Sequence, residues 1–132
     1  MTAVPPQQVT ATRRVTREAI RLYAEASGDF NPIHVDEAFA ATTPFGGIIA
    51  HGMMIVAYAS EMMGQEFSRK WLSGGIMRVR FRNPARPGDV LTITAERQDD
   101  EVISGKRYLR YSLTCHNDKQ VTVIDGQVLV AV

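Results

Sequence analysis

SGDFNPIHVDEAFAATTPFGGIIAHGMM, residues 27–54, is the stretch that decides how the rest of the chain is interpreted. Asp29, Asn31 and His34 lie close together in it, and Pro32 fixes its own φ and excludes the preceding residue from the helical region. The pattern therefore predicts a stiff loop that carries a carboxylate and an imidazole. General acid–base catalysis needs such groups within hydrogen-bond reach of one proton. Asp29 and His34 are the candidate catalytic pair.

Helices are predicted before this loop and within the stretch itself. Thr16 is a favourable N-cap, so a helix is expected over 17–26, and Gly28 can adopt the left-handed conformation that ends it. Asp29 would then leave the helix at its C-terminal end and not lie on one of its faces. A second short helix is expected over 37–41, before a proline and two glycines interrupt the chain.

The apolar segment that follows is expected to be the central helix. GMMIVAYASEMM begins at Gly52 and is apolar on nearly every side, which is typical of a helix covered by other structure, and Gly64 is expected to end it. The segment around Trp71 is expected to be a linker, and 7–13 a short N-terminal strand. The strands expected downstream are 77–82, 90–96, 106–115 and 121–130.

The order of these elements defines the expected fold class. Helices come first and neighbouring strands follow without helices between them, which predicts an α+β fold with an antiparallel sheet packed against one long helix. One sheet can cover only one side of a helix that is apolar all round. A second copy of the chain is expected to cover the remainder, which predicts a homodimer.

Length and composition limit the classes of protein. The 132 residues fit one domain, residues 1–132, of which 1–6 are expected to fray. A formal net charge of +1 argues against a nucleic-acid-binding protein, and no apolar segment reaches the roughly 18 residues that a membrane helix needs. The single cysteine, Cys115, excludes an internal disulfide, and the N-terminus has no signal-peptide pattern, so a cytoplasmic protein is expected.

Two motifs stand close together, SGDFNPIH at 27–34 and AHGM at 50–53, and RNPARPGD follows at 82–89. Together they resemble the signature of the MaoC-like (R)-specific enoyl-CoA hydratases. The resemblance implies a hot-dog fold, in which one antiparallel sheet wraps around one long central helix and two chains dimerise. It also implies reversible hydration of trans-2-enoyl-CoA to (R)-3-hydroxyacyl-CoA, with no metal and no cofactor other than the coenzyme A of the substrate.

The resemblance further implies roles for particular residues. By position, the catalytic pair of the family falls on Asp29 and His34, its carbonyl-binding amide on Gly52, and a supporting active-site serine on Ser60. His34 suits removal of a proton from water, because imidazole is substantially neutral near pH 7. Gly52 begins the apolar helix, where main-chain N–H groups lack intrahelical partners and the helix dipole favours negative charge. An oxyanion formed on a thioester would be stabilised there.

Several polar residues keep two interpretations. Asn31 suits either binding of the water or formation of a turn, and Ser60 suits either a site role or a hydrogen bond to the preceding helical turn. His51 is interpreted mainly as a structural residue that ties the loop to the helix, with a role in the site left open. Cys115 precedes His116, but consecutive strand residues point to opposite faces, so a core cysteine is expected and not a nucleophile.

Basic residues form the main charge asymmetry. No acidic residue stands between positions 67 and 88, a segment that contains Arg69, Lys70, Arg78, Arg80, Arg82 and Arg86. These groups form either a solvated sheet face or a contact with the phosphates of coenzyme A or an acyl carrier protein. The methionines of the apolar helix are expected to fill the core, and some to line an acyl tunnel.

The expected function is therefore hydration of an enoyl thioester, with an acyl-CoA or acyl carrier protein thioester as the partner and neither nucleic acid nor membrane involved. Three alternatives stay open. They are a 3-hydroxyacyl-thioester dehydratase, a hot-dog acyl-CoA thioesterase and a non-catalytic acyl-thioester binding subunit. A metal site built from Asp29, His34 and His51 is not expected, because their spacing matches no recognisable ligand pattern.

Overall fold

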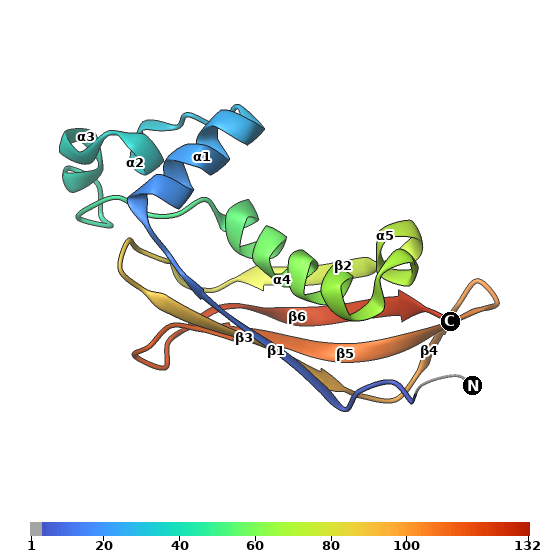
Figure 1. The fold of residues 1–132 in the computed structure, drawn as a ribbon. Coiled ribbons are helices and arrows are strands. Elements are labelled where there is room, and N and C mark those ends of the chain that lie inside the picture. Colours follow the sequence, from blue (N-terminus) through green and yellow to red (C-terminus); the bar gives the residue numbers. More distant parts are fainter. Residues whose placement is uncertain (1–3) are drawn as a thin grey trace.

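One antiparallel sheet and one long helix make up most of the molecule (Figure 1). The computed structural model describes residues 4–132. Its elements are β1 (Gln8–Arg14), α1 (Arg17–Ser27), α2 (Pro32–Val35), α3 (Glu37–Ala41), α4 (Gly52–Phe67), α5 (Arg69–Gly74), β2 (Ile76–Phe81), β3 (Val90–Arg97), β4 (Glu101–Ile103), β5 (Lys106–His116) and β6 (Thr122–Ala131). The strand order is β1-β3-β5-β6-β2, and β4 pairs with β5. Each of these pairs is antiparallel, which confirms the predicted α+β class.

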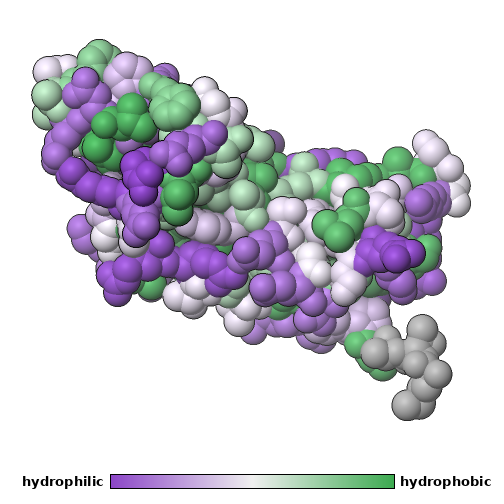
Figure 2. All heavy atoms as spheres, turned by 45° about the horizontal axis from the view of Figure 1, so that its top comes forward, coloured by the Kyte–Doolittle hydropathy of each residue, from purple (hydrophilic) through white to green (hydrophobic). Residues whose placement is uncertain are grey.

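Helix α4 lies across one face of the sheet and supplies the centre of the core (Figure 1). Its buried side chains are Met54, Ile55, Ala59, Met62 and Met63. They belong to one hydrophobic cluster with residues of β3, β5 and β6, and burying each large side chain of this kind contributes about 1.5–3 kcal/mol. The side of α4 away from the sheet is less covered. Met53 is 57% exposed there, and Figure 2 shows hydrophobic surface between polar groups on this side.

Helix α4 is longer than the sequence predicted. It continues through Gly64 and ends at Phe67, so the prediction that Gly64 ends it is wrong. The Gly64 carbonyl accepts a hydrogen bond from the Ser68 N–H at 2.8 Å, and a Cβ at Gly64 would lie 3.7 Å from the Trp71 ring. Packing near Trp71 therefore stabilises a helical turn that a glycine disfavours by about 1 kcal/mol.

Three short elements were not predicted. Helix α2 begins with Pro32, a residue that fits the first helical position because its missing N–H would have no partner there. Helix α5 replaces the expected linker, and its Trp71 is buried against the core. Strand β4 pairs with β5 over Glu101–Ile103, a length too short for an alternating pattern to be recognised.

The chain is tied to the sheet from Pro6 onward. The Tyr111 hydroxyl donates to the Pro6 carbonyl at 2.7 Å, and the Arg97 N–H donates to the Gln7 carbonyl at 2.8 Å. The fraying predicted for residues 1–6 therefore does not extend to Pro6, whereas residues 1–3 lie outside the described part. Among the described helices, none combines the length and the hydropathy that crossing a bilayer would require.

Candidate active site

A cavity of about 500 Å³ opens at the first turn of α4. It is lined by Asp29, His34, Phe45, Ile49, Ala50, His51, Gly52, Met53, Ile55, Phe81, Arg82, Asn83, Pro84, Ala85 and Val123. Most of these residues are apolar and a few polar groups converge, which is the usual composition of a small-molecule site. A second hollow, of about 600 Å³, is lined by β2, β5 and β6 and so lies apart from the loop that carries the carboxylate and imidazole groups.

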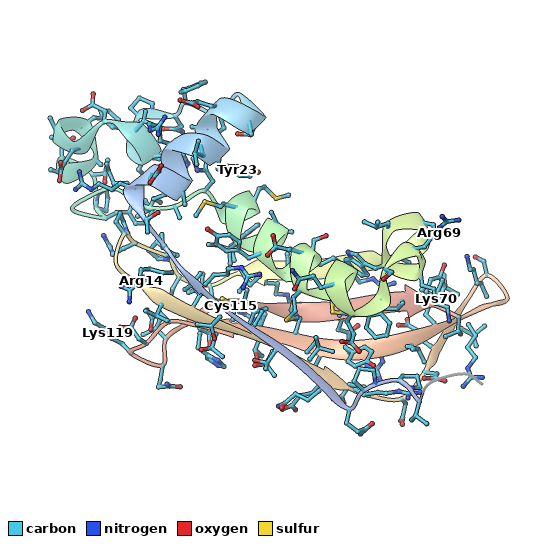
Figure 3. All side chains as sticks on the ribbon, in the orientation of Figure 1. Arg14, Tyr23, Arg69, Lys70, Cys115 and Lys119 are labelled. Atoms are coloured by element: carbon cyan, nitrogen blue, oxygen red, sulfur yellow. The ribbon has the colours of Figure 1, made fainter. Side chains whose placement is uncertain are left out.

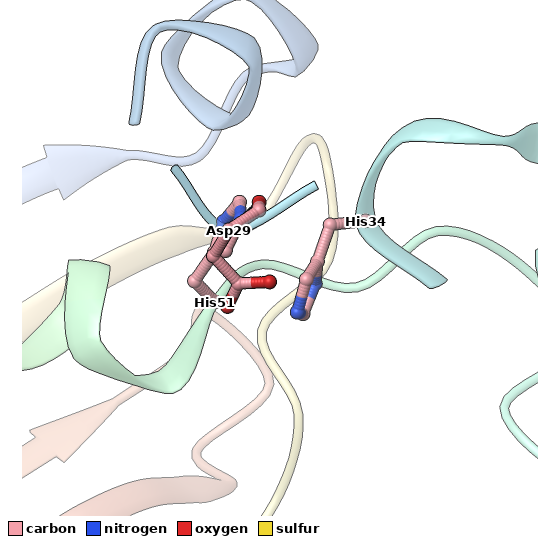
Figure 4. Close-up of side chains that lie close together, drawn as sticks. All are labelled: Asp29, His34 and His51. Atoms are coloured by element: carbon pink, nitrogen blue, oxygen red, sulfur yellow. Dashed lines mark hydrogen bonds between the residues drawn. The ribbon is translucent and has the colours of Figure 1, made fainter. Parts of the chain in front are cut away.

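Asp29 reaches this cavity because α1 ends immediately before it. Gly28 closes α1 with a φ of 78°, a left-handed conformation that most side chains disfavour, and the chain turns there. The Asp29 carboxylate accepts a hydrogen bond from the Asn31 N–H at 3.2 Å. Figure 4 shows the carboxylate directed toward His34.

Asn31 forms the turn between Asp29 and His34. Its side-chain oxygen accepts a hydrogen bond from the Ile33 N–H at 3.1 Å and so caps α2. Asn31 is exposed and is not among the residues that line the cavity. Of its two interpretations, the contacts fit turn formation, and through α2 the cap fixes where His34 stands.

The surroundings of His34 determine which ring nitrogen is free. Its Nδ1 lies 2.7 Å from the carbonyl oxygen of Ile49. A carbonyl oxygen only accepts, so Nδ1 carries the hydrogen and donates it. The neutral ring then presents the lone pair of Nε2, which is the form that a general base requires.

His51 lies beneath this pair and is only 2% exposed. Its Nε2 donates a hydrogen bond to the main-chain carbonyl of Asp29 at 2.9 Å. Its ring stacks on that of His34, with centroids 3.9 Å apart and an angle of 26° between the planes, and the ring of Tyr23 lies 4.8 Å from it. These contacts agree with the interpretation that His51 ties the loop to the helix.

The distances suit one shared water molecule. One side-chain nitrogen or oxygen from each of Asp29, His34 and His51 lies within 4.8 Å of the others. A water oxygen that makes hydrogen bonds of about 2.8 Å to two atoms, at a tetrahedral angle, separates them by about 4.6 Å. The structure therefore brings Asp29 and His34 to a separation that a single water can bridge.

The same three residues fit a metal ion poorly. Ring nitrogens bind a metal through lone pairs in the plane of the ring. The planes of His34 and His51 are stacked, so in this arrangement their in-plane lone pairs run side by side, although the three side chains lie within 4.8 Å of one another. The arrangement instead suits two imidazoles of which one supports the other.

Gly52 is the first residue of α4 and lies in the cavity wall. His51 precedes it as N-cap but makes no side-chain hydrogen bond to the helix, and its carbonyl accepts only from the Met54 N–H, so the N–H groups of Gly52 and Met53 have no partner among the described residues. A Cβ at Gly52 would lie 2.7 Å from Cε1 of Phe81. Glycine therefore lets the Phe81 ring lie close to the first turn of α4 without displacement.

Two residues considered in the sequence lie outside the cavity. Ser60 is about 12 Å further along α4 than Gly52, and its hydroxyl accepts a hydrogen bond from Trp71 Nε1 at 3.0 Å. The structure therefore does not bring Ser60 to Asp29 and His34 within one chain. Cys115 is buried in β5, and burial raises the pKa of its thiol to about 12, which agrees with a core cysteine.

The basic residues of the segment 67–88 do not form one surface. Arg82 lines the cavity and pairs with Asp125 at 3.1 Å, and Arg86 donates to the Phe45 carbonyl at 2.6 Å. Arg69 and Lys70 lie on α5 at the other end of α4 (Figure 3). Of the basic residues in this segment, only Arg82 lines the cavity, whereas Arg78 and Arg80 line the second hollow.

Sequence reasoning missed the apolar walls of the cavity. Phe45, Ile49, Phe81 and Val123 line it from three separate segments, and none was a candidate. The alternating pattern places Phe81 on the apolar face of a strand, and its 56% exposure beside the cavity appears only in the structure.

Comparisons with known proteins identify relatives of the chain. The family model described as MaoC like domain matches residues 2–116. A 3-hydroxybutyryl-CoA dehydratase of Methylorubrum extorquens is 38% identical over 110 residues, 83% of this chain and 68% of that protein. An (R)-specific enoyl-CoA hydratase of Rhodospirillum rubrum is 31% identical over 126 residues, 96% of this chain and 85% of that protein.

A solved structure shows the same architecture. The (R)-hydratase from A. caviae involved in PHA biosynthesis superposes with a TM-score of 0.80 at 26% identity, over 98% of this chain and 96% of that one. The family match spans most of the sequence, and the sheet and central helix are shared with this neighbour. The chain therefore belongs to the MaoC-like domain family and adopts its hot-dog fold.

Proposed function

We propose that the protein is an (R)-specific enoyl-CoA hydratase, a hydro-lyase that adds water to trans-2-enoyl-CoA and gives (R)-3-hydroxyacyl-CoA. The observation that carries this proposal is that the Asp29 and His34 side chains come within 4.8 Å of each other in a cavity beside the first turn of α4. Relatives at 31% and 34% identity are named (R)-specific enoyl-CoA hydratases.

The reaction follows from the three groups at the cavity. His34 Nε2 takes a proton from the water that Asp29 holds, and the oxygen of that water bonds to the β-carbon. The electron pair of the C=C bond moves toward the thioester oxygen, where the Gly52 N–H donates to the enolate. A preorganised donor of this kind is typically worth about 3 kcal/mol in the transition state.

The α-carbon then receives a proton from the Asp29 and His34 pair. One water is consumed, and both side chains return to their starting states. Because both groups stand on one side of the cavity, hydroxyl and hydrogen add to the same face of the double bond. The proposal needs no metal and no cofactor beyond the coenzyme A of the substrate.

A dehydratase is the second candidate, because the same site catalyses the reverse reaction. Relatives named 3-hydroxybutyryl-CoA dehydratase and 3-hydroxyacyl-thioester dehydratase Z favour it. The thioester would then be a 3-hydroxyacyl-CoA or a 3-hydroxyacyl carrier protein. Equilibration from (R)-3-hydroxybutyryl-CoA measures this direction directly.

Turnover of crotonyl-CoA tests the proposal against its rivals. We expect enoyl absorbance to fall without release of free thiol. Thiol release would instead indicate a thioesterase, and binding without any change would indicate a non-catalytic subunit. Asp29→Asn and His34→Ala should each lower kcat by roughly 10²–10⁴-fold, whereas the control His116→Ala, on β5, should not. Normal turnover in either site variant would refute the assignment.

We also propose a homodimer. Strand β2 is at the end of the sheet and has a neighbour, β6, on one side only among the described strands. An edge strand of this kind is a ready template for pairing. Its last residue, Phe81, is 56% exposed, and Met53 of α4 is 57% exposed. Sedimentation should give twice the mass of one chain. A fully active monomer would contradict this part of the proposal.

A cytoplasmic location stays a prediction from the sequence.

A further inference from the structure

His51 is the one buried polar residue at the site whose contacts are not used by the reaction as derived above. It is nearly inaccessible to solvent, yet it contacts both members of the candidate catalytic pair: it donates a hydrogen bond to the Asp29 main chain and stacks on the His34 ring. We propose that His51 is a positioning residue, which sets the orientation of the His34 ring and the place of the Asp29 main chain. The proposal rests on the proposed function and deepens it.

The first contact fixes Asp29. After Gly28 ends α1, the Asp29 main chain belongs to neither helix nor strand, and the residue is exposed. The hydrogen bond from His51 Nε2 to its carbonyl, at 2.9 Å, ties this loop to the start of α4. Because a carbonyl only accepts, the bond also fixes the tautomer of His51, with hydrogen on Nε2 and none on Nδ1 in the neutral ring.

The second contact fixes His34. The hydrogen bond from His34 Nδ1 to the Ile49 carbonyl holds one edge of the ring. The stack on His51, with centroids 3.9 Å apart and 26° between the planes, holds the plane of the ring. With both contacts in place, Nε2 points in one direction, toward the carboxylate side of the cavity (Figure 4).

The third link is covalent. His51 directly precedes Gly52, whose N–H is the proposed donor to the enolate. The buried His51 residue is therefore linked to all three parts of the site, namely Asp29, His34 and Gly52. Tyr23 contacts that ring as well, with centroids 4.8 Å apart, and Nδ1 of His51 makes no hydrogen bond to any described residue. His51 is therefore held by packing and by one bond, and that bond goes to the catalytic loop.

Three substitutions separate the two contacts. His51→Gln keeps an N–H donor at the same distance along the side chain but loses the stack, His51→Phe keeps a ring but loses the donor, and His51→Leu loses both. A misplacement of about 1 Å can lower a rate by about 10²-fold. We expect kcat to fall about 100-fold in His51→Leu and about 10-fold in His51→Gln and His51→Phe. The dissociation constant for butyryl-CoA, which cannot react, should change less than about 3-fold.

Tyr111→Phe is the matched control, since it also removes one hydrogen bond from a buried aromatic residue to a main-chain carbonyl. It should lower stability and leave kcat unchanged. A kcat in the His51 variants that simply follows the folded fraction would overturn the proposal, and so would Gln and Phe variants as impaired as Leu. Should His51→Leu fail to fold, the Gln and Phe variants alone decide between these outcomes.

A readout independent of turnover keeps this test apart from that of the proposed function. Side-chain NMR relaxation of the imidazole rings should show one fixed orientation of the His34 ring in the native protein and a more mobile ring in His51→Leu, where Nδ1 keeps its bond to the Ile49 carbonyl but the stack is lost. Unchanged mobility of the His34 ring in that variant, or in His51→Gln where Leu does not fold, would refute the positioning role. Lack of turnover in the native protein, with this mobility result intact, would refute the proposed function alone.

Discussion

Substitution of Gly52 by alanine tests the start of α4 as the site of the enolate. The new Cβ would lie 2.7 Å from Cε1 of Phe81, whereas ordinary contact begins at 3.4 Å, so the ring must retreat by about 0.7 Å. Phe81 is 56% exposed and has room to move, which places the cost at the low end of overpacking, about 1 kcal/mol. For a chain of 132 residues this lowers Tm by roughly 4 °C.

The expected loss of activity is larger than this loss of stability. The methyl group would lie between the first turn of α4 and Phe81, which both line the cavity, and so would displace a thioester oxygen from the main-chain N–H. Losing a donor worth about 3 kcal/mol lowers kcat/KM by roughly 100-fold. Thermal unfolding and crotonyl-CoA turnover measure the two effects, at one fixed protein concentration because the chain is proposed to dimerise.

A double variant separates packing from chemistry. Phe81→Ala removes the ring that the methyl group would strike, so Gly52→Ala with Phe81→Ala should be no less stable than Phe81→Ala alone. Its activity should stay roughly 100-fold below that of Phe81→Ala, because the methyl group still displaces the thioester from the N–H. Recovery of both stability and activity would refute the reasoning and assign Gly52 to packing alone.

Three further predictions concern the scaffold. Gly126→Ala would place a Cβ 1.9 Å from a main-chain oxygen of β2, so urea unfolding should show that the free energy of unfolding falls by about 3 kcal/mol or more. The control Gly47→Ala, where nothing lies within 4 Å, should lower it by less than about 0.5 kcal/mol. Equal losses in the two variants would contradict the close packing of β6 on β2. Cys115, with its pKa raised to about 12 by burial, should resist a thiol reagent at pH 8 until urea unfolds the chain, and rapid native labelling would disprove its burial. Ser60→Ala should cost about 1 kcal/mol, because Trp71 Nε1 loses its acceptor, with kcat unchanged; a fall in kcat would instead support the active-site role implied by the family.

Elements with local signals could be predicted from the sequence. Helix α1 begins after Thr16, whose hydroxyl accepts a hydrogen bond from the Ala19 N–H at 3.0 Å, and it ends at Gly28 as expected. Helix α3 covers Glu37–Ala41, as predicted, for the same reason: Asp36 caps it. Capping depends on a few neighbouring residues, so sequence alone is sufficient to locate it.

Elements that depend on distant contacts could not be predicted from the sequence. The extra turn of α4 beyond Gly64 and the whole of α5 are stabilised by the burial of Trp71, and the sequence does not say what covers that ring. Strand β4 forms because β5 continues past the end of β3 and offers a partner to Glu101–Ile103. Intrinsic preference is a weak guide where packing of this kind decides.

The candidate site also combines features that local sequence predicts with features that depend on distant contacts. Asp29 and His34 could be recognised because one turn, fixed by Pro32, holds them, whereas the stack of His34 on His51 joins residues that the fold brings together from separate helices. The apolar walls contributed by β2 and β6 were also hidden, since an alternating strand reveals which residues share a face and not which loop that face meets. The chemistry of the site is thus encoded locally, but its geometry depends on the sheet and on α4 and so appears only in the folded chain.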